Sequence, residues 1–373
     1  MKKVLSFVLA LVLVIGIGSV GAFAEGDGYL VVTDYVACNT GRDVSDELQR
    51  LIEDNPNRTL FFPDGEYLLS KPIYTPADPK KSVSLKLANY AVLKATGDWK
   101  YGEAVVQLGG IYPKNDTRTP GSNYFLDGGI IDGSGKANGV SINGGRETMV
   151  KNVSMKNVVT GLHIMYGANS GSSDSDILDL NIICTGGTDS TGILIEGYDN
   201  TITNVRIGNA FIGVHVKSAG NVMRNIHPLY TSDYTNYTNS CGFWDQCGNN
   251  WYDFCYSDQY GIAFRLDGGV KSIFNDCYCY WYSKSGDSHT AFKVDGQFQS
   301  TVTNFKADLP DCEGSNLLVV DKSGGKGRFT NLSVKENRLE NRLYKAYVAD
   351  SGIINLLPRF FYKIAVFFVT LFK

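Results

Sequence analysis

A six-residue phrase recurs along most of this chain and restricts its fold more than any other feature of the sequence. The phrase is an apolar residue, any residue, Asn or Asp, an apolar residue, any residue and an apolar residue. Its copies begin at Val150, Ile177, Ile202, Met223, Trp251, Phe274, Val302 and Phe329, and residues 125–127 match its first half. Successive Asn or Asp positions lie 21 to 28 residues apart, a period typical of stacked structural repeats.

Each repeat is too rich in turn residues to hold a long helix. Its alternation of apolar and polar residues accommodates two or three short strands, separated by Gly, Asn, Ser and Asp. The sequence therefore predicts an all-β chain in which every repeat is one turn of a parallel β-helix with a narrow apolar core. The recurrent Asn should hydrogen-bond from turn to turn. We assign the same structural role to Asp127, Asp179, Asp253 and Asp276.

A second recurring strand precedes each copy of the phrase and predicts a polar outer face. Aligning these strands gives a first outward column, which contains Ser141, His163, Leu194, His215, Trp244, Arg265, Lys293 and Val319. The second outward column contains Asn143, Met165, Glu196, Lys217, Gln246, Asp267, Asp295 and Asp321. Neighbours within a column should lie about 4.8 Å apart, and the two columns about 6.6 Å apart.

The N-terminus predicts export from the cell. Lys2 and Lys3 precede an apolar stretch that ends in Ala22, Phe23 and Ala24, the pattern of a secretory signal peptide cleaved after Ala24. We therefore expect a secreted, extracellular protein. A formal net charge of -3 argues against a nucleic-acid partner, which would call for a basic stripe.

The eight cysteines of this exported chain raise the question of disulfides. Cys241 and Cys247 flank an extended strand, so their Cα atoms should be roughly 20 Å apart, too far to bridge. Cys277 and Cys279 are predicted to face inward as free thiols, stacked on Phe254 and Tyr256. No C-x-x-C motif occurs, and we predict no metal site of Cys and His.

The segment before the repeat resembles a known superfamily. Residues 41–49 (GRDVSDELQ) predict a helix that Asp43 or Ser45 caps and that ends near Asp54, and strand, turn and strand follow in residues 57–73. Together with the IIDG turn at residues 130–133, this order resembles the pectate-lyase-like, rhamnogalacturonase/epimerase-type superfamily from about Val31 to Val334. The resemblance implies a right-handed parallel β-helix with an N-terminal capping helix.

The resemblance also implies extracellular polysaccharide chemistry, because similar proteins are mostly hydrolases, lyases or epimerases of acidic glycans. The polygalacturonase motifs are missing, however, apart from fragments at residues 206–208 and 213–215, and no Ca²⁺-site pattern of the pectate lyases is present. Catalytic residues therefore cannot be carried over from the superfamily. Ca²⁺ is expected only if the chain is a lyase, and otherwise no cofactor.

The predicted organisation has four parts. Residues 1–24 form the signal peptide, 25–80 the N-terminal cap and first coil, 81–335 the parallel β-helix, and 336–373 a C-terminal cap or interfacial tail. The apolar run from Ile364 to Phe372 is too short to span a bilayer. Capping the last coil and membrane association through clustered Phe, Lys and Arg are both open for this tail. A monomer and a trimer are equally open.

Two adjacent carboxylates of the second column predict a glycosidase site. Hydrolysis of a glycosidic bond generally uses one protonated and one ionised carboxyl group, about 5 Å apart for retention or 6.5 to 9.5 Å for inversion. Asp267 and Asp295 should stack near the shorter separation, and Arg265 and Lys293 should offset their repulsion. A turn-forming role is the alternative for Asp267 and Asp295, since both precede Gly as Glu196 does, and a structural role is also the alternative for Asp321.

Asp245 is a further catalytic candidate because it breaks the alternation of its strand. It stands where other repeats place Ile, Val or Leu, so its burial would be costly unless it is paired or bulged outward. Asp245 and Asp267 would then provide the wider, inverting separation. Trp244 beside it offers a flat ring for stacking on a sugar.

The remaining candidates concern substrate binding and other enzyme classes. Insertions at residues 166–175, 230–240 and 283–289 should wall a groove, in which His215, Lys217, Arg265 and Lys293 hold an acidic glycan. If the substrate is a uronate polymer, Arg265 or Lys217 would act as the base of a β-elimination. The third alternative is a non-catalytic glycan-binding surface protein.

Overall fold

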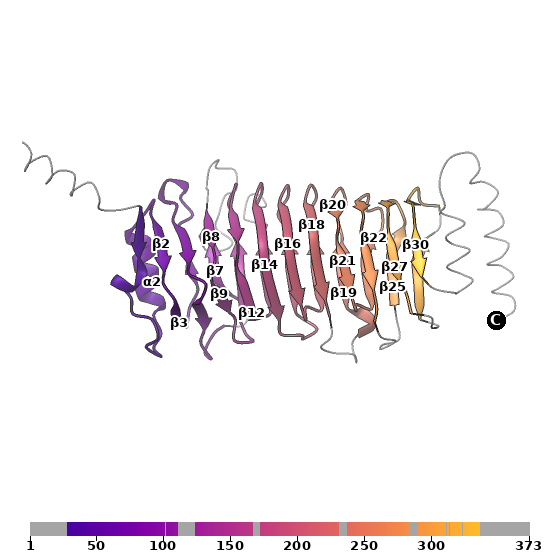
Figure 1. The fold of residues 1–373 in the computed structure, drawn as a ribbon. Coiled ribbons are helices and arrows are strands. Elements are labelled where there is room, and N and C mark those ends of the chain that lie inside the picture. The colour runs from indigo at the N-terminus through magenta and orange to yellow at the C-terminus, as the bar shows by residue number, and fades with distance from the viewer. Residues whose placement is uncertain are drawn as a thin grey trace, which may run out of the picture.

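The chain forms a long rod of coils stacked along one axis (Figure 1). The computed structural model describes residues 28–100, 102–110, 124–166, 172–230, 237–282, 289–310, 312, 314–322 and 324–335. Strand pairings throughout these residues are parallel, and each strand pairs with its counterpart one coil away. The predicted parallel β-helix is confirmed. The predicted signal peptide and the C-terminal residues 336–373 lie outside the described residues, and the domain boundaries stay predictions.

One side of the rod is a ten-stranded parallel sheet. Its strands, in chain order, are β4 (Ile73–Tyr74), β7 (Ala104–Leu108), β10 (Asn138–Ile142), β13 (Thr160–Ile164), β15 (Thr191–Ile195), β17 (Ile212–Val216), β19 (Cys241–Asp245), β22 (Ile262–Asp267), β25 (His289–Gln297) and β28 (Ser315–Lys322). Inward residues of these strands are apolar in nearly every coil, and the outward residues form the predicted columns.

The other sides belong to a twenty-stranded sheet with two arms that meet at a bend. The first arm contains β1 (Tyr29–Val31), β2 (Thr59–Phe62), β5 (Ser84–Leu87), β8 (Phe125–Asp127), β11 (Met149–Lys151), β20 (Trp251–Asp253), β23 (Ile273–Asn275), β26 (Thr301–Thr303) and β29 (Arg328–Thr330). The second arm contains β3 (Gly65–Leu69), β6 (Ala91–Ala95), β9 (Ile130–Asp132), β12 (Ser154–Val158), β21 (Tyr256–Asp258), β24 (Tyr278–Tyr280), β27 (Lys306–Asp308) and β30 (Ser333–Lys335). Three strands run through both arms: β14 (Asp176–Cys184), β16 (Thr201–Gly208) and β18 (Val222–Leu229).

An amphipathic helix lies at the N-terminal end of the rod, as predicted (Figure 1). Helix α2 spans Ser45–Asp54 and buries Leu48, Leu51 and Ile52. The N-cap residue is Val44, without a side-chain capping hydrogen bond, so the predicted cap by Asp43 or Ser45 is wrong. Asp43, one residue earlier, accepts a hydrogen bond from the Ser45 backbone N–H at 3.0 Å. Short 3-10 turns occur at η1 (Val32–Asp34), η2 (Pro79–Lys81) and η3 (Tyr237–Asn239).

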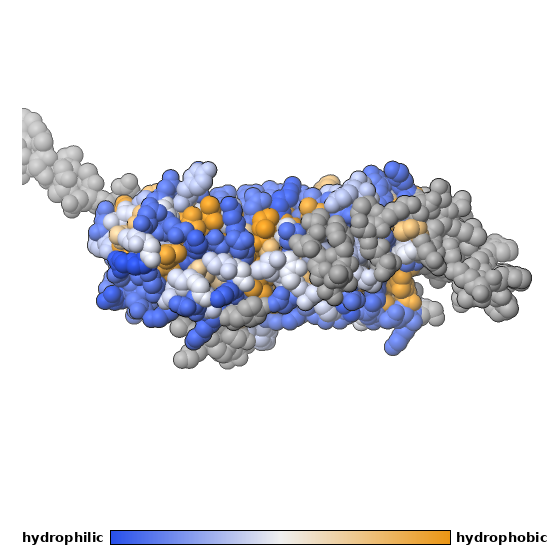
Figure 2. Space-filling model, turned by 90° about the horizontal axis from the view of Figure 1, so that it is seen from below, coloured by the Kyte–Doolittle hydropathy of each residue, from blue (hydrophilic) through white to orange (hydrophobic). Residues whose placement is uncertain are grey.

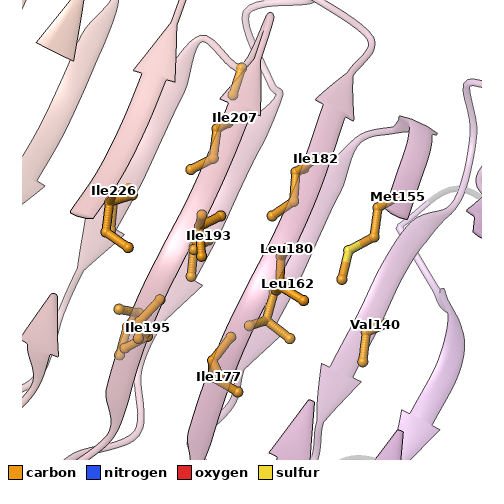
Figure 3. Close-up of a cluster of buried hydrophobic side chains, with 14 of the residues drawn as sticks. Val140, Met155, Leu162, Ile177, Leu180, Ile182, Ile193, Ile195, Ile207 and Ile226 are labelled. Carbon is orange, nitrogen blue, oxygen red and sulfur yellow. The ribbon is translucent and has the colours of Figure 1, made fainter. Parts of the chain in front are cut away.

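Aliphatic side chains of successive coils stack on one another inside the rod (Figure 3). Ile177 and Ile182 of β14 pair in register with Ile202 and Ile207 of β16, and all four are buried. Burial of each such side chain stabilises the folded state by roughly 1.5 to 3 kcal/mol. The face of the rod drawn in Figure 2 is mostly hydrophilic where it is coloured, with hydrophobic residues visible between the polar ones.

The recurrent Asn and Asp form the predicted ladder at the bend between the two arms. Asn152 donates to Asp127, Asn204 to Asp179 and Asn225 to Asn204 across neighbouring coils, with distances of 2.7 to 3.0 Å. The ladder continues from Asn304 to Asp276 and from Asn331 to Asn304. Most of these residues have a left-handed backbone, for example φ 57° at Asn204. Asn and Asp tolerate this conformation better than other residues with a side chain, which explains their recurrence.

The predicted frame of one coil is wrong by a single residue. Trp251 and Phe254 are 42% and 58% exposed, whereas Tyr252 and Cys255 are buried. Tyr252 pairs with Phe274, and Phe254 takes the left-handed bend with φ 53°, so Asp253 does not occupy the ladder position. The phrase led to the wrong frame because its Asn or Asp position is filled only when it begins at Trp251, whereas in the structure Phe254 stands at the bend. Consequently Cys279 stacks on Ser257 and Cys277 packs against Cys255, not on the predicted Tyr256 and Phe254.

All eight cysteines are free, and five of them are buried. Desolvation raises the pKa of the Cys277 and Cys279 thiols well above the ordinary value. These two thiols therefore pack as small apolar groups, as predicted.

A second ladder, which the sequence analysis missed, lies inside the rod before the first arm. Asn200, Asn221 and Asn250 are fully buried, and the backbone N–H of each earlier residue donates to the side-chain oxygen of the next at 2.9 to 3.1 Å. Ser272 and Ser300 extend the series. Each member stands two residues before the first inward residue of the phrase. That regular offset is the signal that would have revealed the ladder.

We predict that the interior ladder stabilises the rod more than the exposed one. Asn221→Ala leaves buried backbone groups without partners, so it should lower the free energy of unfolding by about 2 to 4 kcal/mol. Asn204→Gly keeps the left-handed bend and removes only exposed hydrogen bonds, so its cost should stay below about 1 kcal/mol. Urea denaturation of both variants measures the difference. Equal costs would contradict the structural role given to the interior ladder.

Candidate functional site

The first outward column of the ten-stranded sheet is in register along its length. Paired positions run from Ser141 to His163, Leu194, His215, Trp244, Arg265, Lys293 and Val319. In the second column Asp267 pairs with Asp295 on adjacent strands. The early members Ser141 and Asn143 are buried, so the accessible polar face begins near His163. Stacking thus brings together eight of the nine candidate residues.

Trp244 lies between two charged or polar neighbours that cover both faces of its ring. The His215 ring is stacked on it at 4.4 Å with an interplanar angle of 3°, and the Arg265 guanidinium lies 4.1 Å from its centroid. His215 and Arg265 come from the strands on either side of β19. The prediction that a sugar stacks on the face of Trp244 is therefore wrong, because neither face is free.

Asp267 accepts hydrogen bonds from uncharged donors. Trp244 Nε1 donates to Oδ1 at 2.9 Å, and Gln246 Nε2 donates to Oδ2 at 3.1 Å. The Gln246 carbonyl oxygen lies 2.6 Å from His215 Nε2, which places a proton on that nitrogen. Burial lowers the pKa of His215, although the hydrogen bond to Gln246 opposes this. His215 therefore positions Gln246, and Gln246 positions Asp267.

Asp295 has cationic partners instead. Arg265 Nε and Nη2 each lie 2.7 Å from Asp295 Oδ2, and Lys293 Nζ lies 3.7 Å from Oδ1. Arg265 thus contacts Trp244 with the face of its guanidinium and Asp295 with its N–H groups. Two neighbouring carboxylates therefore have distinct electrostatic surroundings: neutral donors around Asp267 and cations around Asp295.

Glu196 lies two coils before Trp244 and is firmly ionised. His163 Nε2 lies 2.9 Å from Oε2, and Lys217 Nζ lies 3.1 Å from Oε1. The hydrogen bond from His163 lowers the pKa of Glu196 to about 2. Lys217 contributes to the lowering, and burial opposes it. A carboxyl group in this setting does not suit the role of proton donor near neutral pH.

Asp245 is the candidate that stacking does not bring to the outer face. It is 1% exposed and points into the rod, where it accepts hydrogen bonds from five groups. These are the backbone N–H of Cys247 and Gly248, Asn250 Nδ2, Tyr252 OH and Ser272 Oγ. The strand does not bulge outward, so Asp245 and Asp267 do not form the predicted inverting pair on one surface. Asp245 instead joins the interior ladder through Asn250 and Ser272.

Two features of the face were not anticipated from the sequence. Gln246 contacts both His215 and Asp267. The alignment placed it in the second column without assigning it a role, although its position one coil before Asp267 indicated a contact with that residue. Tyr256 and Asp258 of β21 and Tyr278 and Tyr280 of β24 also face outward, on the second arm. The phrase that begins at Trp251 had placed Tyr256 in the core instead.

A hollow on another part of the rod contains none of the predicted site residues. A shallow hollow of about 490 Å³ is lined by Lys94, Asp132, Ser134, Gly135, Asn157 and Thr185, none of them a predicted site residue. No cluster of three or more His, Cys, Asp or Glu suited to a metal ion occurs in the described ranges. The same ranges contain no helix long and apolar enough to cross a membrane. The insertions at 166–175, 230–240 and 283–289 fall largely outside the described residues.

Comparison with known proteins shows the fold. No protein-family model matches the sequence, and no curated protein matches it either. The structure is similar to a double mutant of the tailspike protein of Escherichia coli bacteriophage HK620 in complex with a pentasaccharide, with 10% identity, a TM-score of 0.62, and coverage of 83% of this chain and 67% of that one. ORF18 of Geobacillus virus E2 is similar at 12% identity and a TM-score of 0.57, over 87% of this chain. This chain covers only 64% of the length of ORF18.

We predict that Asp245 acts on stability. Asp245→Asn replaces one of the two carboxylate oxygens with an NH₂ group, which cannot accept hydrogen bonds from the surrounding donors. The substitution should therefore lower the free energy of unfolding by about 2 to 4 kcal/mol. Urea denaturation measures this cost. If the Asp245→Asn protein were as stable as the wild type, the hydrogen bonds to the buried carboxylate would not stabilise the fold.

The pKa of Glu196 predicts a difference in acid stability between the wild type and Glu196→Gln. Because its folded-state pKa is about 2, below the ordinary value of 4.5, the ionised group stabilises the fold above about pH 4.5 and loses this effect as the pH falls towards 2. The Tm of the wild type should exceed that of Glu196→Gln at neutral pH, and the gap should close between about pH 4.5 and 2. A gap independent of pH over this window would contradict the assigned pairing.

Proposed function

We propose that this protein is a polysaccharide-active enzyme, a glycoside hydrolase that works on the outer face of its ten-stranded sheet. The observation that carries the proposal is the register of Asp267 and Asp295, two carboxylates on adjacent strands with different partners. Adjacent parallel strands are about 4.8 Å apart, which is near the carboxylate separation of retaining glycosidases. The similarity to a tailspike solved with a pentasaccharide agrees with a carbohydrate substrate but carries no residue assignment.

The two carboxylates have different roles in this proposal. Asp295 is ionised next to Arg265 and Lys293 and acts as the nucleophile towards the anomeric carbon. Asp267, held only by neutral donors, protonates the leaving glycosidic oxygen and later activates the water that releases the product. Trp244 and Gln246 fix its orientation. Arg265 positions Asp295 and maintains its charge.

The polar surroundings of the pair suit the hydroxyl groups of a sugar chain. Lys217, Lys293 and Arg265 lie on the same face, but each is ion-paired with Glu196 or Asp295. With Asp267 included, three cations stand beside three carboxylates. The face therefore has no excess of positive charge that would select an acidic glycan. The same ion pairs disfavour β-elimination, because neither Arg265 nor Lys217 is free to accept a proton from a uronate.

Secretion is part of the proposal and rests on the N-terminal sequence alone. A polysaccharide-active enzyme with a signal peptide cleaved after Ala24 would meet its substrate outside the cell. Membrane association through residues 336–373, and a monomeric or trimeric state, stay predictions.

We predict that substitution of either carboxylate abolishes hydrolysis while the fold is retained. Asp267→Asn and Asp295→Asn should each lower kcat by about 10² to 10⁴ on whichever bacterial or plant polysaccharide the wild type cleaves. Release of reducing ends measures the hydrolysis, and absorbance in the ultraviolet would reveal unsaturated products of a lyase. Asp321→Asn, an exposed acid of the same column, is the matched control with full activity expected.

Two outcomes would contradict the proposal. Full activity in Asp267→Asn or Asp295→Asn would remove that residue from the mechanism. Binding of glycans by the wild type without release of reducing ends or unsaturated products would favour a non-catalytic binding protein.

A further inference from the structure

The second arm of the large sheet presents an outer face that the proposed hydrolase site does not use. Its first outward column contains His227, Tyr256, Tyr278 and Lys306, on β18, β21, β24 and β27. Its second outward column contains Leu229, Asp258, Tyr280 and Asp308. A column of aromatic rings that ends in Lys306 thus lies beside a column in which Asp258, Tyr280 and Asp308 alternate.

The first column forms a continuous stack. The rings of His227 and Tyr256 are 4.1 Å apart, those of Tyr256 and Tyr278 are 4.9 Å apart, and Lys306 Nζ lies 4.5 Å from the Tyr278 centroid. Each tyrosine hydroxyl donates to an acid of the second column: Tyr256 to Asp258 at 3.2 Å and Tyr278 to Asp308 at 2.6 Å. The stack therefore holds both carboxylates in place.

Asp258 has a carboxylate oxygen that the protein does not satisfy. The residue is 9% exposed, its Oδ2 accepts the Tyr256 hydroxyl, and its Oδ1 is buried without a hydrogen-bond partner among the described residues. His227 Nε2, also without a hydrogen-bond partner there, lies 3.6 Å from Oδ2. A desolvated carboxylate oxygen without a donor costs free energy, and a ligand hydroxyl would remove that cost.

Tyrosine rings extend this surface beyond the two acids. Tyr280 pairs with Asp258 on one side and Asp308 on the other, and strand spacing puts the two acids roughly 10 Å apart along the rod. The ring centroids of Tyr280 and Tyr282 are 6.5 Å apart, and Tyr282 is 60% exposed. Accessible aromatic rings beside fixed hydrogen-bond acceptors are suited to the apolar face and the hydroxyl groups of a sugar.

We propose that Asp258, Tyr280, Tyr282 and Asp308 form a second saccharide-binding site, the tyrosine face, separate from Asp267 and Asp295. A side-chain shift uncovers the Asp258 carboxylate and a sugar hydroxyl donates to it, a second hydroxyl donates to Asp308, and Tyr280 and Tyr282 contact the ring. The site rests on the proposed carbohydrate specificity of the protein but not on catalysis. Its task is to hold the polymer outside the cleavage site.

The hydrogen-bond acceptors of the tyrosine face select the class of saccharide. Lys306 Nζ lies 3.4 Å from Asp308, and Lys335 pairs in register with Asp308, so two lysines balance the charge of Asp258 and Asp308. Carboxylate oxygens only accept hydrogen bonds, and the hydroxyl or amino groups of a neutral or amino sugar supply donors, whereas the carboxylate of a uronate supplies none. The ligand class is therefore a neutral or amino-sugar oligosaccharide.

An array of defined bacterial and plant oligosaccharides tests the site with the full chain. Binding is measured in the Asp267→Asn background, so that cleavage does not remove the probe. We expect neutral or amino-sugar oligosaccharides to bind, and addition of Asp258→Asn or Tyr282→Ala to weaken that binding about tenfold or more. Asp276→Asn, at a ladder position where other coils carry Asn, and Tyr90→Ala, an exposed tyrosine of the N-terminal coils, are the matched controls and should bind like the background.

The outcomes separate this site from the proposed hydrolase. Binding that depends on Asp258 in a protein without hydrolytic activity would support the tyrosine face and contradict only the proposed enzyme. Unchanged binding in both Asp258→Asn and Tyr282→Ala, binding restricted to uronate oligosaccharides, or no binding to any array member would overturn the tyrosine face. Weaker binding in the controls as well would also overturn it, since the loss would then be unspecific.

Discussion

In-register stacking of coil on coil is the constraint on which the rest of this structure depends. Two ladders of side chains join one coil to the next: exposed Asn and Asp side chains bond to one another at one bend, and buried Asn and Ser side chains accept backbone N–H groups before the first arm. Because both ladders require equivalent residues to lie one above another, they fix the register of every strand between them. A slip of one residue would turn the apolar core outward.

The same register creates the candidate sites. His215, Trp244 and Arg265 come from three coils, yet they form one stack that orients Asp267 and Asp295. Without neighbours on adjacent coils, each of these side chains would be solvated. Stacked in register, they form a network of hydrogen bonds and ion pairs in which nearly every charge has a partner. The second arm repeats this principle with His227, Tyr256 and Tyr278, and leaves one buried carboxylate oxygen unsatisfied.

The sequence predicted the fold and the first outward column because both follow from a repeat that can be counted. It gave the wrong frame at Trp251 and Tyr252, because Asp253 matches the phrase while the residue that stands at the bend is Phe254. It anticipated that Asp245 would need partners but could not show that five donors converge on it from other turns. The covered faces of Trp244 were equally hidden, because rotamers and neighbours across coils leave no trace in the spacing. Strand periodicity therefore predicts which residues lie on the same face of the sheet. It does not predict which of their side chains already have partners within the protein.

The claim that stacking in register forms a hydrolase site from Asp267 and Asp295 can be tested by a crystal structure of the Asp267→Asn protein, soaked with an oligosaccharide of the polysaccharide that the wild type cleaves. We expect a glycosidic bond over β22 and β25, with the anomeric carbon next to Asp295 and the leaving oxygen next to residue 267. A sugar bound away from these strands, or coils stacked in a register that separates residues 267 and 295, would contradict it.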